Sequence, residues 1–97
     1  MTYTVELRDF PGHLPDADRT VAESRYRAAL EKKLGGADNV PYHFRAFMSA
    51  AETEDNQLTK PEAVAAAAYM VAQHEAVQAG FRGLGHSDEA YFEVRLG

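Results

Sequence analysis

Five side chains have the types and the pattern that could bind a small anion. A histidine and an arginine alternate in one segment, and a tyrosine and an arginine lie near the C-terminus. A second histidine lies in an alanine-rich segment. Guanidinium groups bind carboxylates and phosphates through paired hydrogen bonds, and imidazole and phenol groups can donate to the same oxygens. The candidate ligand-binding residues are therefore His43, Arg45, His74, Tyr91 and Arg95.

Two of these residues, His74 and Arg95, also have a purely structural interpretation. His74 falls in register with Met70 and Val71 of a helical pattern, which favours a histidine packed in the core over one that lines a pocket. Arg95 alternates in sign with Glu93 on a strand pattern, so charges could simply pair across neighbouring strands. We keep both interpretations for these residues.

Other kinds of site have little support in the sequence. The chain has no cysteine, which excludes disulfides and thiolate metal ligands, and its four histidines show no recognised metal-ligand spacing. A glycine-rich stretch at 80–85 follows a helix pattern and precedes a strand pattern, whereas a phosphate loop requires the opposite order. We therefore expect no metal and no cofactor, and assign no catalytic residue.

Composition predicts one packed domain over residues 1–97. Apolar residues make up 45% and charged residues 26%, a balance that supports a core rather than disorder. The net charge of −5 opposes nucleic-acid binding, and no basic cluster offsets it. The longest apolar run, 63–72, is too short to span a bilayer. We expect an acidic, soluble, cytoplasmic protein without nucleic-acid or membrane partners.

Alternating segments at the two ends of the chain predict β-strands. Residues 3–10 and 90–96 each alternate apolar and polar side chains, as half-buried strands do. The residues expected to face the core are Tyr3, Val5, Leu7, Ala90, Phe92, Val94 and Leu96.

Two segments predict helices, and each begins with a Thr-x-x-Glu capping pattern. The first runs from Thr20 to a glycine stop at Gly35, and the second from Thr59 to Gly80. On the second helix we expect an apolar core face, opposite a side lined by alanine. That expected core face is Ala63, Val64, Ala67, Met70, Val71, Val77 and Phe81.

Residues 39–51 fit two structures. Alternation of Tyr42, Phe44, Ala46 and Met48 predicts a strand over 42–49, and its aromatic content favours this choice. Helical spacing also fits the segment, with Asn39 as a cap.

Together these elements predict an α+β fold in the order β-α-(β)-α-β. Its sheet has three strands, or two if the middle segment is helical, and both helices pack on one face. Exposed sheet edges and the alanine-lined side of the second helix favour a homodimeric protein-interaction module. The acidic balance suits a basic protein partner. The alternative is a small enzyme or anion-binding domain that uses His43, Arg45, His74 and Tyr91.

Overall fold

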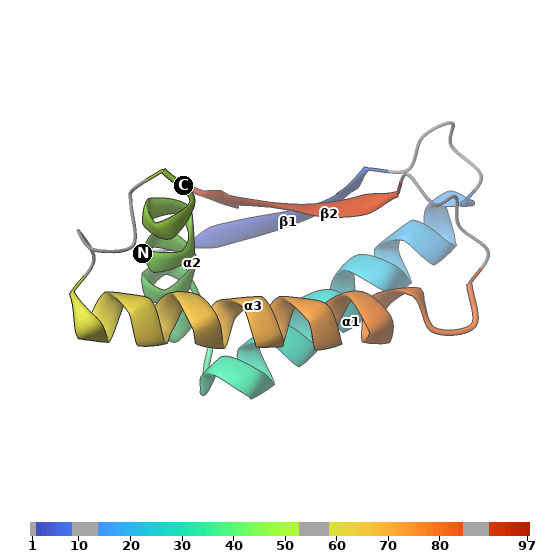
Figure 1. Ribbon diagram of the computed structural model, residues 1–97. Coiled ribbons are helices and arrows are strands. Elements are labelled where there is room, and N and C mark those ends of the chain that lie inside the picture. The colour runs from blue at the N-terminus through green and yellow to red at the C-terminus, as the bar shows by residue number, and fades with distance from the viewer. Residues whose placement is uncertain (1, 9–13, 53–58, 85–89) are drawn as a thin grey trace.

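The computed structural model describes residues 2–8, 14–52, 59–84 and 90–97 of the chain. Within these residues the chain is α+β, with three helices and one antiparallel sheet of two strands. In the view of Figure 1 the long third helix crosses in front of the other two, and the two-stranded sheet runs above it. The elements are β1 (Tyr3–Arg8), α1 (Asp16–Leu34), α2 (Asn39–Glu52), α3 (Lys60–Phe81) and β2 (Tyr91–Leu96).

The two terminal segments form strands and pair with each other, as their alternation predicts. Tyr3 lies opposite Leu96, and Leu7 lies opposite Phe92. Tyr3, Leu7 and Phe92 are buried in the same cluster as side chains of α1 and α3, so helices cover one face of the sheet. The other face is polar and more exposed, because the side chains of a strand alternate between faces.

The prediction of a strand over residues 42–49 is wrong, because this segment is the helix α2. The rings of Phe44 and Phe47 lie 5.6 and 5.1 Å from the ring of Tyr69 on α3. Residues three apart share one face of a helix but lie on opposite faces of a strand. Contact of both phenylalanines with one tyrosine therefore requires the helix, and it outweighs the weak strand preference of the aromatics.

Helix α1 begins one turn earlier than predicted, at Asp16 after Pro15. The Thr20 hydroxyl donates to the Asp16 carbonyl oxygen, 3.2 Å away, so Thr20 lies inside the helix and does not cap it. The predicted end is confirmed, because Gly35 adopts a left-handed φ of 88° directly after Leu34. The sequence also places Ala22, Tyr26, Ala29, Leu30 and Leu34 at helical spacing as one apolar stripe, and all of them except the partly buried Ala29 are buried.

Helix α3 begins as predicted, because the Thr59 side chain accepts a hydrogen bond from the Glu62 amide. Its predicted end at Gly80 is one residue early, since the helix continues to Phe81. A Cβ at position 80 would lie 2.6 Å from the Phe92 ring, so only glycine fits between α3 and β2 here. This glycine therefore permits close packing and does not terminate the helix.

The predicted core face of α3 is wrong except near the C-terminal end of the helix, where Phe81 is buried and Val77 is partly buried. Its alanine side packs against α1 and α2, whereas Val64, Met70 and Val71 face solvent. Alanine adds no atoms beyond Cβ, so neighbouring helices can approach closely along that side. The buried residues of the helix are Ala65, Ala66, Tyr69, Ala72, Ala76, Gly80 and Phe81.

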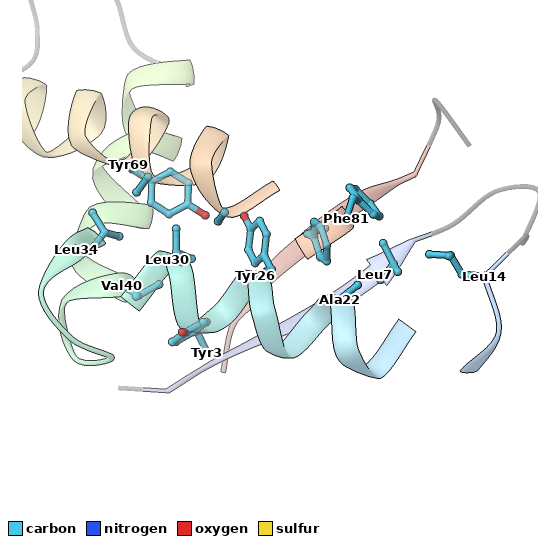
Figure 2. Packing of buried hydrophobic residues seen from close by; sticks show 13 residues of the cluster. Tyr3, Leu7, Leu14, Ala22, Tyr26, Leu30, Leu34, Val40, Tyr69 and Phe81 are labelled. Atoms are coloured by element: carbon cyan, nitrogen blue, oxygen red, sulfur yellow. The ribbon is translucent and has the colours of Figure 1, made fainter. Parts of the chain in front are cut away.

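Two tyrosines lie at the centre of the core. The Tyr26 ring stacks on Phe92 with centroids 4.3 Å apart, and the Tyr26 and Tyr69 hydroxyls point toward one another (Figure 2). The Tyr26 hydroxyl is buried and has no hydrogen-bond partner in the described part of the chain. Burial raises the pKa of both phenols, although for Tyr26 the neighbouring Tyr69 hydroxyl opposes that rise.

Candidate interaction surfaces

The five predicted ligand-binding residues lie on three different elements. His43 and Arg45 lie on α2, His74 lies on α3, and Tyr91 and Arg95 lie on β2. A strand over 42–49 would have placed His43 and Arg45 on the polar sheet face beside Tyr91 and Arg95, but their segment is a helix, so they do not lie on that face. His74 is exposed and not packed in the core, so that interpretation is wrong.

The two histidines and Arg95 each have a local partner on their own element. His43 donates from Nδ1 to the Asn39 carbonyl oxygen at 2.7 Å, and the Gln78 amide donates to His74 Nε2 at 3.2 Å. Arg95 pairs with Glu93 on the same strand. His74 lines a surface groove together with Phe47 and Met70, and the other four predicted residues do not line this groove. Their ligand-binding role stays a prediction.

The solvent-facing side of α3 is apolar. Its residues Val64, Met70 and Val71 have exposed fractions of 61%, 58% and 52%. The segment 63–74 contains no charged residue, so no charge interrupts this side over three turns. We define the α3 outer face as Val64, Ala67, Met70, Val71 and His74.

A groove of about 350 Å³ borders the α3 outer face on the side of α2. Met70 and His74 line it, and Phe47 contributes the wall from α2. A mixed apolar and polar hollow of this kind can accept a side chain from another molecule. The residues that line it are Phe47, Met70, Gln73, His74 and Val77.

The outer edge of β1 is closed by side chains of α1. The Leu7 amide donates to the Glu23 carboxylate at 2.7 Å, and Arg19 donates to the Leu7 carbonyl oxygen at 2.8 Å. Arg27 donates to the Tyr3 carbonyl oxygen at 3.2 Å, and its guanidinium lies over the Tyr3 ring. These contacts satisfy backbone groups that an edge strand would otherwise expose.

The outer edge of β2 has no such closure. The amide and carbonyl of Leu7 point away from β2, so Leu7 and its partner Phe92 form a pair without ladder hydrogen bonds. By alternation, Val94 and Leu96 also direct their amides and carbonyls away from β1. No described group hydrogen-bonds to these outward backbone groups.

Charges on the polar sheet face are balanced by arginine. Glu6 lies opposite Glu93, and Arg8 pairs with both at 3.1 and 3.0 Å. Hydrogen bonds from Arg95 and Arg8 hold the pKa of Glu93 below its usual value, and the bond to Glu93 raises the pKa of Arg8. The predicted pairing of charges across the two strands is confirmed by the contact between Arg8 and Glu93.

Sequence reasoning did not find the α3 outer face or the closed edge of β1. The uncharged run 63–74 was a signal for the first, since a solvent-facing helix side normally carries charge. No sequence signal indicates the second, because it depends on where α1 lies beside β1.

The described residues also restrict other kinds of site. Within 2–8, 14–52, 59–84 and 90–97, no three histidine, aspartate or glutamate side chains gather as metal ligands would. Among the described helices, none combines the length and the hydrophobicity that a bilayer span requires. Comparison of the chain with protein-family models, with curated proteins and with solved structures gives no match.

Proposed function

We propose that this domain is a small homodimeric protein-interaction module and that the α3 outer face binds its partner protein. The observation that carries the proposal is the exposure of Val64, Met70 and Val71 along a charge-free stretch of helix. Contiguous apolar surface of this kind marks interaction sites in soluble proteins, because covering it removes the cost of hydrating it.

The charges around this face favour a partner with an apolar centre and a basic rim. Glu62 and Glu75 lie at the two ends of the uncharged run, and Glu75 is half exposed although Lys33 lies 3.4 Å away. Acidic groups at the rim of an apolar patch attract a basic partner and orient it. This agrees with the partner expected from the net charge of −5. The acidic run at 52–55 lies outside the described residues except for Glu52.

A site-specific photocrosslinker tests this function in the native host. We expect a benzophenone side chain at Val71 to give one discrete adduct, because that position would contact the partner. The same group at Ser24, an exposed position on α1, is the matched control and should give none. Replacing Val64 with glutamate should abolish the Val71 adduct, because it places a charge in the apolar contact.

Absence of an adduct at Val71, or equal adducts at Val71 and Ser24, would refute this function. The mass of the adduct distinguishes a second copy of this chain from a different protein.

A further inference from the structure

We propose that two copies of this chain pair through the open edges of β2, antiparallel about a two-fold axis at Val94. The resulting sheet would have four strands in the order β1-β2-β2-β1. This inference supplies the contact of the proposed homodimer and leaves the α3 outer face free for a partner.

The backbone amides and carbonyls along the outer edge of β2 point away from β1. Three α1 side chains hydrogen-bond the outer edge of β1 at Tyr3 and Leu7, which sets the hydrogen-bonding phase of both strands. The bond from the Gly97 amide to the Thr2 carbonyl oxygen, 3.2 Å, agrees with that phase. Phe92, Val94 and Leu96 therefore present their amides and carbonyls outward, where another strand can pair with them.

The sequence of β2 is complementary to itself around Val94. With Val94 opposite Val94 of the second copy, Glu93 lies opposite Arg95 and Phe92 opposite Leu96. Each copy contributes one such charge pair, so the dimer contains two of them on its polar face. On the other face only apolar side chains meet. One register thus satisfies the hydrogen bonds, the charges and the apolar contacts together.

The adjacent two-fold registers are disfavoured by charge. A shift toward one end places Glu93 opposite Glu93 of the second copy, and a shift toward the other places Arg95 opposite Arg95. The proposed register instead adds a cation beside Glu6 and Glu93, two carboxylates that already lie opposite each other. Like charges that face each other are destabilising, so this strand selects the register centred on Val94.

Self-association and its loss in one variant test the contact. We expect sedimentation equilibrium to show twice the chain mass of 10.7 kDa. Val94→Pro removes both hydrogen bonds at the two-fold axis and leaves the β1 ladder intact, because the Val94 amide points away from β1. We expect it to weaken dimerisation by about 10-fold to 100-fold. Circular dichroism checks that the variant folds.

Disulfide formation tests the register even if the proline variant does not fold. The chain has no cysteine, so any crosslink comes from the introduced thiols. Val94→Cys should oxidise to a covalent dimer, since opposite Cα atoms would lie about 5.5 Å apart. Glu93→Cys should crosslink with Arg95→Cys in a mixture but not with itself. Val71→Cys, on the α3 outer face, is the control and should stay monomeric.

Three results would overturn this inference. They are sedimentation as a monomer, no crosslink at Val94, or self-crosslinking of Glu93→Cys. Efficient crosslinking at Val71 would instead place the dimer contact on α3, which refutes pairing through β2 but leaves the proposed function standing.

Discussion

The two sides of α3 differ in a way that a hydrophobicity scale does not anticipate. The inner side carries small residues and Tyr69 and is buried against α1 and α2, whereas the outer side carries valine and methionine and is exposed. Close approach of helix axes requires small side chains at the contact, and the gain from dense packing follows from that approach. Size therefore decided which side of α3 became core, and the larger apolar residues were left as surface.

Aspartate substitutions on the two sides of α3 should give the largest difference in the free energy of unfolding. Ala72 is fully buried and its neighbour Val71 is 52% exposed. Ala72→Asp should cost at least about 3 kcal/mol of folding free energy or prevent folding, because it buries an unpaired charge. Val71→Asp should change it by less than about 0.5 kcal/mol. Urea unfolding measures both, and equal losses would contradict the assignment of the two sides.

The tyrosine packed beneath the inner side gives the next largest effect. Tyr26 is fully buried against Phe92, so Tyr26→Ala should cost about 3–5 kcal/mol through the cavity it leaves. Tyr26→Phe removes only a hydroxyl that has no described partner, so its cost should lie within about 1 kcal/mol of zero. A large loss in the phenylalanine variant, measured by thermal or urea unfolding, would show that the hydroxyl is bound.

Alkaline pH should weaken the inner side of α3 and spare the outer side. Burial raises the pKa of Tyr26 and Tyr69 above 10, so the fold keeps both phenols protonated while the unfolded chain loses its protons. Their stabilising contribution is complete below about pH 10, the ordinary pKa of tyrosine, and decreases as the pH rises above it. Urea unfolding at pH 9, 10 and 11 measures this, with Tyr26→Phe as the control of shallower slope. Equal stability at pH 9 and pH 11 would contradict it.

Patterns between residues close in sequence correctly predicted the strands and helices that have one apolar and one polar side. The alternation at both ends of the chain identified both strands and their inward residues, because one side of each strand is polar. The apolar stripe of α1 could also be predicted, because apolar residues recur on one side of that helix. The cap at Thr59 could be predicted because a threonine hydroxyl accepts a hydrogen bond from a backbone amide in the first turn of a helix.

The candidate surfaces were readable only in part. Arg95 and Glu93 were recognised as charged neighbours on a strand, but the open edge of β2 follows from the position of α1 beside β1. The sequence predicts His74 and Val71 in the core, and both are exposed. Helical spacing shows which residues share one side of a helix, but it does not show which side is buried.

By itself the sequence determined an α+β fold with two terminal strands, a capped alanine-rich helix and a net charge of −5. Each of these depends on neighbours a few residues apart or on composition. The tertiary structure alone decided that residues 39–52 are helical, that α3 buries alanine and that α1 closes β1 but not β2. These three features depend on contacts between elements that are far apart in the sequence. Alanine and aromatic residues fit more than one secondary structure and more than one packing arrangement, so the tertiary contacts decide which one forms.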